Sequence, residues 1–408
     1  MRQSTEPHAR DAGIEVLIAA VASSEQLSGV PRHAINLAIS LLTRSEISRV
    51  HIAVGTWQLK AIVAALPPAD SRLVVHGIEV ERNAIARNLW YYRKLPTLAA
   101  ALHADLIHLA YPVPVNRRRF SCPVVVTLHD LYPYDIPENF GFPKVLVNRA
   151  ILKQCIHAVD TIACVSESTL ERLDMHAPAV AIQKASIVYN CVNANLEDGD
   201  LSPLPGWMGE PFLLVVAQHR RNKNVVLAVE IFRCLLRLGT IANDTRLIVI
   251  GIDGPETPRV LSFIRGAGLT NKIALIQGVS DAELAWCYMH CELLLAPSST
   301  EGFGYPIVEA MLHHTRVVCS DIPAFREVGG SYCHYADLQL DPVKSFTEAV
   351  KTALQNHKFR SGSVECFSSV RVGEAYLRLY SRLLDDSLDP NRFERFKEIS
   401  MIERRQTQ

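Results

Sequence analysis

The chain has 408 residues, of which 49% are hydrophobic and 21% are charged, and this length suggests two globular domains of ordinary size. Lysine plus arginine equals aspartate plus glutamate at 42 each, so the charge balance argues against a protein that binds nucleic acid. The ten cysteines form no CxxC motif and no paired framework, which predicts reduced thiols in a cytoplasmic protein.

Apolar runs and helical stretches alternate through the first half of the chain. The polar residues 1–15 hold no apolar core, so we expect no signal peptide, and no apolar run approaches the roughly 20 residues of a membrane helix. Repeated strand-helix units predict a parallel sheet with helices on both faces. The predicted strands are 14–21, 50–54, 72–76, 106–109, 124–128 and 161–165, and one long helix is expected over 83–102.

A short loop joins the first strand to a helix predicted over 32–42. This loop contains Ser28-Gly29-Val30-Pro31-Arg32 and lacks the GxGxxG fingerprint of dinucleotide-binding proteins, which argues against NAD as a ligand. From the residues alone, Gly29 is either an ordinary turn glycine or part of a ligand-binding loop.

A basic and aromatic stretch follows at 82–94, and three arginines follow it at 117–119. Such a composition could dock on an anionic membrane surface or on a polyanionic glycan, which would make peripheral membrane contact a further property of the chain. A solvated helix face explains the same residues.

A histidine and an aspartate directly follow the strand 124–128. Ligands of open parallel sheets bind beyond the carboxyl ends of the strands, so His129 and Asp130 are expected to face the crevice, although a lone histidine is often structural. Ser166 is expected to cap a helix over 168–173.

The segment 194–211 is rich in proline, glycine and acidic residues and is expected to link two domains. Its Asp198-Gly199-Asp200 resembles a metal-binding DxD motif only superficially, because no apolar strand precedes it.

The second half opens with a strand predicted over 211–217 and a cluster of cations. Arg220, Arg221 and Lys223 lie between this strand and a helix that runs through Leu238, and this placement predicts an anion site. Either arginine could take the phosphate-binding role. Ser280 and Glu283 form a capping box ahead of the next helix.

A second strand-to-helix junction follows the strand 292–296. Gly302 and Gly304 occupy the turn, and Pro306 is expected to be the first helical residue, so N–H groups and the helix dipole can face a phosphate. Glu301 and Glu309 are suited to the hydroxyls of a diol, since each carboxylate can accept two hydrogen bonds. Alternatively, both are solvated charges. The segment 321–327 is expected to be a loop, with helices over 343–356 and 369–384.

The pattern of Glu301 and Glu309 around Gly302-Phe303-Gly304, together with Arg220-x-x-Lys223, resembles the signatures of the family 4 glycosyltransferases. The setting of His129 in Thr-Leu-His-Asp-Leu-Tyr-Pro resembles that family's sugar-contacting histidine motif, and Gly29 matches its glycine-rich loop. The resemblance extends over about 14–384.

The resemblance implies an α/β protein of the GT-B fold, with two Rossmann-like parallel-sheet domains that face each other across a cleft. The expected parts are an acceptor domain at 1–205, a nucleotide-sugar domain at 206–368, and a crossover helix and tail at 369–408 that return to the first domain. The implied reaction moves a sugar, with mannose favoured around Arg220, from a nucleotide sugar to a glycan or lipid-linked acceptor. The resemblance further implies retention at the anomeric carbon and a role in surface polysaccharide biosynthesis. It also implies a location in the cytoplasm or at the inner face of the membrane. The resemblance implies no cofactor and no metal, with a nucleotide sugar such as GDP-mannose as co-substrate.

The resemblance also assigns roles to individual residues. His129 and Glu301 are the expected catalytic residues. The expected donor-binding residues are Gly29, Arg220, Lys223, Gly302, Phe303, Gly304 and Glu309.

Several positions depart from the family pattern. Ser28, Ala217 and Cys191 stand where the family more often has glycine, and Asn193 stands where aspartate is common. The helix after Glu309 ends without the usual glycine, so His314 is expected to adopt the left-handed conformation. These departures leave a second hypothesis open, in which the chain is a GT-B-fold binding or scaffold protein without turnover.

Overall fold

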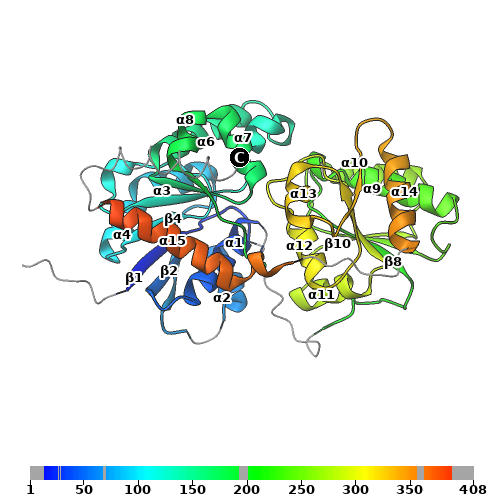
Figure 1. The fold of residues 1–408 in the computed structure, drawn as a ribbon, viewed down its shortest axis with the longest axis horizontal. Helices are drawn as coiled ribbons and strands as arrows, with labels where there is room; N and C mark the ends of the chain where they lie inside the picture. Colours follow the sequence, from blue (N-terminus) through cyan, green and yellow to red (C-terminus); the bar gives the residue numbers. More distant parts are fainter. Residues whose placement is uncertain are drawn as a thin grey trace, which may run out of the picture.

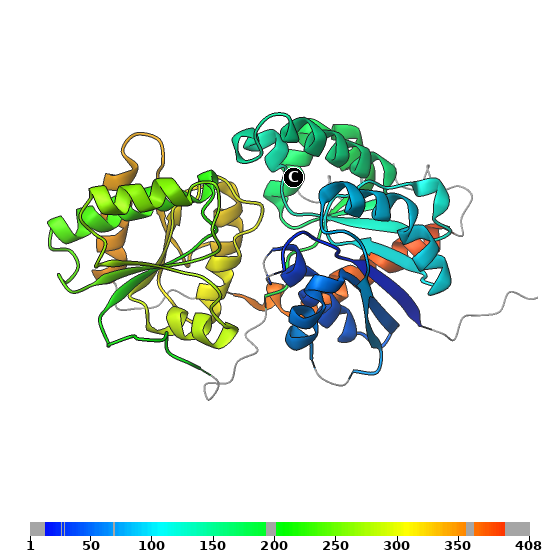
Figure 2. The same cartoon turned by 180° about the vertical axis from the view of Figure 1, so that it is seen from behind.

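The computed structural model describes residues 13–25, 27, 29–67, 70–192, 201–355 and 363–387. They form two parallel β-sheets, each covered by helices, that lie beside each other in Figures 1 and 2. The first sheet has seven strands in the order β3-β2-β1-β4-β5-β6-β7, and the second has six in the order β10-β9-β8-β11-β12-β13. The expected α/β fold with two parallel-sheet domains is therefore confirmed.

The first domain alternates strands with helices as the sequence predicts. Its strands are β1 Ile14–Ala19, β2 Ile47–Gly55, β3 Leu73–Ile78, β4 Leu106–Leu109, β5 Val124–Leu128, β6 Thr161–Cys164 and β7 Ala185–Ile187. Its helices are α1 Val30–Leu42, α2 Leu59–Ala65, α3 Ala84–Arg93, α4 Leu95–Ala101, α5 Tyr132–Asp135, α6 Lys144–Ala158, α7 Glu167–His176 and α8 Pro178–Lys184. Apolar side chains of the sheet are buried on both of its faces, which explains why the strands are nearly continuous apolar runs.

The second domain repeats this arrangement. Its strands are β8 Phe212–Val216, β9 Arg246–Ile250, β10 Ile273–Ile276, β11 Leu293–Ala296, β12 Val317–Ser320 and β13 His334–Ala336. Its helices are α9 Val225–Arg237, α10 Thr257–Gly266, α11 Asp281–His290, α12 Tyr305–Leu312, α13 Pro323–Gly329 and α14 Pro342–Gln355, with the short 3-10 turn η5 at Arg221–Lys223. Two buried apolar clusters again lie on the two faces of the sheet.

The last helix, α15 Ser369–Ser387, lies across the first domain although it follows α14 of the second (Figure 1). Tyr376 and Tyr380 share a buried cluster with residues of β1 and α1. The approach of α15 to α1 is close, because a Cβ added to Gly373 would lie 2.2 Å from the carbonyl oxygen of Ser40. The predicted crossover to the first domain is confirmed.

Local signals explain several element ends. The Ser166 hydroxyl accepts a hydrogen bond from the Thr169 N–H at 2.9 Å and caps α7, and the capping box of Ser280 and Glu283 begins α11. His314 has a φ of 54°, the left-handed conformation expected from the missing glycine.

Three local predictions are wrong. The helix expected over 83–102 is two helices that meet at Lys94, because Pro96 has no N–H to continue the ladder. The loop expected over 321–327 contains α13, which Pro323 begins with its fixed φ. Pro306 is the second residue of α12 and not the first.

Some predictions fall outside the described residues, namely those on Ser28, Asn193, Asp198-Gly199-Asp200 and the tail 389–408. The domain limits at 205 and 368 stay a prediction. Among the helices within the described ranges, none has the length and apolarity needed to span a bilayer.

Candidate functional site

The predicted site residues follow the carboxyl ends of three strands. His129 follows β5 of the first sheet, while Arg220 follows β8 and Glu301 follows β11 of the second. The two sets meet, because the Tyr132 hydroxyl of the first domain donates to Glu301 of the second at 3.2 Å. Residues far apart in the sequence thus form one interdomain site.

The carboxylate of Glu301 is held by a cation of its own domain. Lys223 Nζ lies 2.5 Å from Glu301 Oε1, and the two side chains are 20% and 9% exposed. Asn222 adds hydrogen bonds to the Thr300 carbonyl at 3.2 Å and to the Tyr132 hydroxyl at 3.3 Å. Lys223 and Glu301 were predicted from separate motifs, and the structure places them in contact.

Arg220 and Arg221 are the cations of this cluster whose side chains have no hydrogen bond or ion pair within the described ranges. Arg220 is half-buried and Arg221 is exposed. Burial raises the pKa of the Asp130 carboxyl of the first domain to about 6, and the positive charge of Arg220 lowers this pKa. A half-buried guanidinium without a counterion is suited to bind a phosphate.

The turn before α12 supplies backbone donors. The N–H groups of Gly302, Phe303, Gly304 and Tyr305 have no hydrogen-bond partner in the part of the chain that the structure describes. Gly304 has a φ of 113°, a conformation that favours glycine and turns the chain into the helix. These N–H groups and the helix dipole form a cradle for an anion.

Gly302 has a second role that the sequence did not suggest. A Cβ added to Gly302 would lie 1.6 Å from the His129 carbonyl oxygen, so only glycine allows this contact between the domains. The Gly302 carbonyl also accepts hydrogen bonds from Ser166 Oγ at 2.5 Å and from Thr169 Oγ1 at 3.1 Å. Gly302 therefore lies on the surface where the two domains touch.

Phe303 and Gly29 contribute through the backbone. The Phe303 ring is 4% exposed and packs against Phe367 at a ring distance of 5.5 Å, so its side chain belongs to the core. Gly29 caps α1 with a φ of 45°, which favours glycine, and a Cβ there would meet no atom within 4 Å.

Glu309 lies about one turn into α12. It accepts a hydrogen bond from the Tyr288 hydroxyl at 2.7 Å. Burial raises the pKa of Glu309, while the Tyr288 hydrogen bond and the charge of Arg32 oppose this rise. The carboxylate therefore retains acceptor capacity for a further donor.

The neutral His129 ring donates from one nitrogen and can accept a hydrogen bond at the other. Its Nε2 lies 2.9 Å from the Ala110 carbonyl oxygen, so this nitrogen must carry the proton and Nδ1 holds the lone pair. Burial lowers the pKa of His129 to about 4. The His33 ring stands perpendicular to it, with ring centres 4.6 Å apart and an interplanar angle of 86°.

A cavity of about 440 Å³ lies between the domains beside Glu301. Asp130, Thr169 and Arg172 line it from the first domain, and Arg221 and Glu301 line it from the second. Its volume is within the range of small-molecule sites.

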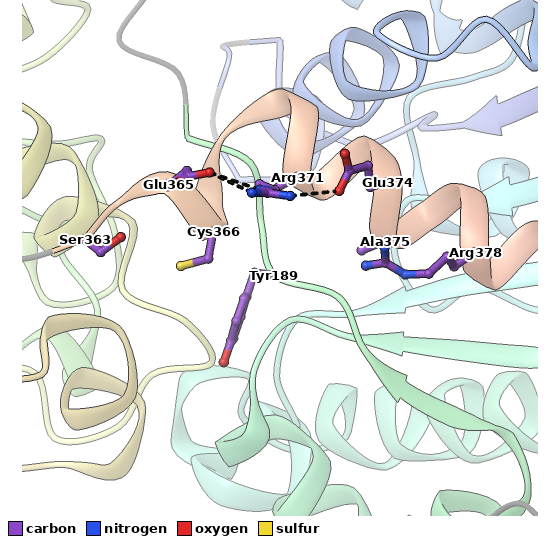
Figure 3. Close-up of a pocket in the computed structure, with 8 residues that line it drawn as sticks. All are labelled: Tyr189, Ser363, Glu365, Cys366, Arg371, Glu374, Ala375 and Arg378. Carbon is purple, nitrogen blue, oxygen red and sulfur yellow. Dashed lines mark hydrogen bonds and ion pairs between the residues drawn. The ribbon is translucent and has the colours of Figure 1, made fainter.

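A second cavity, of about 470 Å³, lies at the start of α15, and Figure 3 shows its lining. None of the predicted site residues lines it. Arg371 is bound by Glu365 at 2.9 Å and by Glu374 at 3.3 Å, so its charge is neutralised. We therefore assign no sugar donor to this cavity, although Arg378 also lines it.

Other interdomain contacts were not predicted. Arg32 of α1 makes a two-fold ion pair with Asp281 of α11, at 2.6 and 2.9 Å. Glu327 of α13 accepts hydrogen bonds from the N–H groups of Glu167 and Ser168 at 2.7 and 3.1 Å, at the start of α7. Each pair joins residues more than 150 positions apart, and no local pattern marks them.

Within the described ranges, no group of three or more His, Cys, Asp or Glu side chains could hold a metal ion. The expectation that the reaction needs no metal stays a prediction.

Two family models match adjoining parts of the chain. The model "Glycosyltransferase Family 4" matches residues 27–196, and the model "Glycosyl transferases group 1" matches residues 205–362.

Curated relatives are similar at 20–26% identity. The O-antigen chain mannosyltransferase RfbU of Salmonella typhimurium is 26% identical over 56% of this chain and 60% of its own length. The serotype-specific mannosyltransferase WbdA of Escherichia coli is 25% identical over 64% of this chain and 33% of its own length. The O-antigen chain mannosyltransferase B of Escherichia coli is 25% identical over 82% of this chain and 89% of its own length. The matched part thus spans less than two thirds of the first two relatives.

Solved structures share the fold. HepE of Anabaena, solved in complex with UDP and glucose, has a TM-score of 0.66 at 15% identity and covers 90% of this chain and 99% of its own. WaaG, a glycosyltransferase involved in lipopolysaccharide biosynthesis, has a TM-score of 0.61 at 14% identity over 95% of this chain and 99% of its own. The chain shares its two-domain fold with both structures, and the expected GT-B arrangement is confirmed.

Proposed function

We propose that this chain, which belongs to family 4 of the glycosyltransferases, transfers a sugar from a nucleotide sugar to a hydroxyl group of a glycan. One observation carries the proposal. Arg220 after β8 and the free N–H groups before α12 would form an anion site near Glu301 of that turn and Glu309 of α12, opposite His129 of the other domain. An anion site flanked by hydroxyl acceptors is suited to a diphosphate joined to two sugars.

The anion site would stabilise the leaving group. When the glycosyl bond breaks, negative charge develops on the departing diphosphate, and donors that are already in place lower the barrier. Arg220 and the N–H groups of Gly302 to Gly304 supply such donors without reorganisation. Lys223 adds positive charge and holds Glu301 in position, because the two are in contact.

The carboxylates and the histidine would hold the two sugars. Glu309 would accept hydrogen bonds from the ribose diol, and Glu301 would accept one from the transferred sugar. His129 would accept a hydrogen bond from a sugar hydroxyl at Nδ1, since Nε2 already donates to the Ala110 carbonyl. Retention at the anomeric carbon is part of the proposal, and it rests on the family resemblance.

Mannose is the sugar that we propose, with GDP-mannose as donor. The names of RfbU, WbdA and mannosyltransferase B support it, since all three are mannosyltransferases. The same names support a role in building a surface polysaccharide on a glycan or lipid-linked acceptor. Action at the inner face of the membrane stays a prediction.

The test uses the purified full chain with GDP-mannose, UDP-glucose and UDP-galactose. We expect release of GDP from GDP-mannose, faster when an oligomannoside acceptor is added, and an α-linked product in its NMR spectrum. Binding of GDP without release from any donor would instead support the scaffold hypothesis. An inverted linkage would contradict the retaining mechanism alone.

The side chains at two of the departures that suggested a scaffold belong to the domain cores. Cys191 is buried in the first domain and Ala217 in the second. His314 follows the end of α12, where its left-handed conformation is accommodated. The enzyme is therefore the function that the geometry supports best.

A further inference from the structure

A buried polar cluster lies under the histidines of the cleft. Its centre is the Thr127 hydroxyl on β5, which lies 3.0 Å from His33 Nε2 and 2.7 Å from His108 Nε2. The Tyr376 hydroxyl of α15 lies 3.5 Å from the same oxygen. Three elements of the first domain and the crossover helix thus meet at one atom.

The cluster extends in both directions from Thr127. His108 Nδ1 lies 2.6 Å from the Tyr380 hydroxyl of α15, and His33 Nδ1 lies 3.0 Å from Asn190 Oδ1. The side chains of these residues are at most 2% exposed. Buried polar groups are costly without partners. Asn190 Nδ2 is an exception in this cluster, because it is buried and has no hydrogen-bond partner within the described ranges.

The hydrogen bonds of this cluster, which we call the relay, run in one direction. The Asn190 oxygen only accepts, so His33 carries its proton on Nδ1 and its Nε2 must accept from the Thr127 hydroxyl. Thr127 has no second proton, so His108 donates from Nε2. Its Nδ1 then accepts from the Tyr380 hydroxyl. This order of donors and acceptors follows from the Asn190 amide oxygen facing His33 Nδ1.

The relay ends beside His129 at the interdomain cleft. The His33 ring stands against His129 at 4.6 Å, and the His129 proton is held by Ala110, two residues after His108. Burial lowers the pKa of His33, and it lowers the pKa of His108 to about 3, so both rings stay neutral at ordinary pH. The rings therefore cannot exchange tautomers by taking up a proton from solvent.

We infer that Thr127 is a positioning residue, whose hydroxyl ties the crossover helix α15 to His33 and so holds His129 toward the donor sugar. This inference rests on the proposed function, because it assigns the held histidine to the sugar. The inference gives α15, the last described helix, a part in the site through Tyr376 and Tyr380. Within the described ranges, α15 makes no hydrogen bond to the anion site.

Thr127→Val tests the role, because valine keeps the shape and removes the hydroxyl. We expect kcat with GDP-mannose to fall by about tenfold, as is typical when a supporting hydrogen bond behind a ligand residue is lost. The Kd of GDP should stay within about twofold. Thr127→Ser should restore most of kcat, since the hydroxyl returns.

Thr161→Val is the matched control. Thr161 lies beside Val125 on the neighbouring strand β6, and its hydroxyl donates to the Lys184 carbonyl at 2.7 Å, outside the relay. We expect a comparable fall in Tm with little change in kcat. Equal losses of kcat in the two valine variants, or no rescue by serine, would overturn the positioning role.

Nitrogen NMR of the histidines gives a readout that does not depend on turnover. His33 should be neutral with its proton on Nδ1, and His108 neutral with its proton on Nε2. Tyr380→Phe should change the His108 signals and lower kcat in the direction of Thr127→Val, which covers the case that Thr127→Val does not fold. The opposite tautomers would overturn the relay.

The proposed function and the positioning role of Thr127 can be tested separately. A wild-type chain that releases no nucleotide from any donor would overturn the proposed function, and the positioning role with it. An active wild type whose kcat is insensitive to Thr127→Val and Tyr380→Phe would overturn the positioning role alone.

Discussion

The two walls of the interdomain cleft differ in the groups that they offer a ligand. The wall of the second domain, the charged wall, carries Arg220, Lys223, Glu301 and Glu309. The first-domain wall presents His129, whose pKa burial lowers to about 4, together with Asp130 and Arg172 of the cavity lining. The cations of the charged wall are suited to a diphosphate, and the neutral His129 ring is suited to a hydroxyl of a sugar. Leaving-group stabilisation and sugar recognition therefore depend on different residues, so each wall can be altered by itself.

Lys223→Ala removes the central cation of the charged wall and should have the largest effect. The variant leaves a carboxylate that is 9% exposed without its counterion, beside the site of the diphosphate. Loss of one member of a close, desolvated charge pair costs about 2–5 kcal/mol, so kcat/KM for GDP-mannose should fall roughly 10²- to 10³-fold.

Calorimetry should show a matching loss in GDP affinity for Lys223→Ala. Lys272→Ala, at a lysine that binds the Asn243 carbonyl in the same domain, is the control and should leave both quantities unchanged. An unaltered GDP affinity in Lys223→Ala would mean that the anion site is elsewhere.

Gly302→Ala should separate the two walls without changing a charge. The new Cβ would lie 1.6 Å from the His129 carbonyl oxygen, and backbone on both sides must move apart. A misplacement of about 1 Å can cost about 10²-fold in rate, so we expect kcat to fall by about that factor.

Small-angle scattering should show a larger radius of gyration for Gly302→Ala. Gly266→Ala is the control, since a Cβ there meets nothing within 4 Å and alanine is favoured in the helix α10. Wild-type kcat in Gly302→Ala would show that the contact with His129 is dispensable.

The charged wall was predictable from the sequence because its parts are local. Arg220, Lys223 and Glu301 each follow a strand end, and the structure confirms that Lys223 and Glu301 meet. The contacts between the walls were not predictable, since Ser166 meets Gly302 across 136 positions and Glu167 meets Glu327 across 160. They depend on how two finished domains pack. The break in the helix at Pro96 was visible in the sequence, and the prediction of one long helix there was wrong.

Glu309→Gln removes a buried carboxylate from the charged wall and should have a smaller effect. Burial raises the pKa of Glu309 above its ordinary 4.5, so the folded state binds a proton that the unfolded state has lost. Its contribution to stability is therefore largest at low pH and declines as the pH rises from about 4.5 through the folded pKa. The Tm difference between wild type and Glu309→Gln should follow this decline.

The same variant should weaken GDP binding by about tenfold, because hydrogen bonds to a charged acceptor are worth about 1.5–3 kcal/mol. Glu348→Gln, on α14 at a carboxylate that pairs with Lys351, is the control for both measurements. A Tm difference that does not vary with pH would show that Glu309 does not titrate in this window.

The ion pair of Arg32 and Asp281 joins the rims of the two walls and should have the smallest effect. The two side chains are 34% and 52% exposed, so solvent screens them, and a double-mutant cycle with Arg32→Ala and Asp281→Asn should give a coupling of about 0.2–1 kcal/mol in stability. The pair of Arg326 and Asp321 is matched in its shortest distance, 2.6 Å, and is 54% and 43% exposed, but it lies within one domain. If closure brings the walls together during turnover, only the Arg32 cycle should also show coupling in KM for GDP-mannose, of about twofold to fivefold at these energies. Equal coupling in KM for the two pairs would show that the rim contact is not specific to closure.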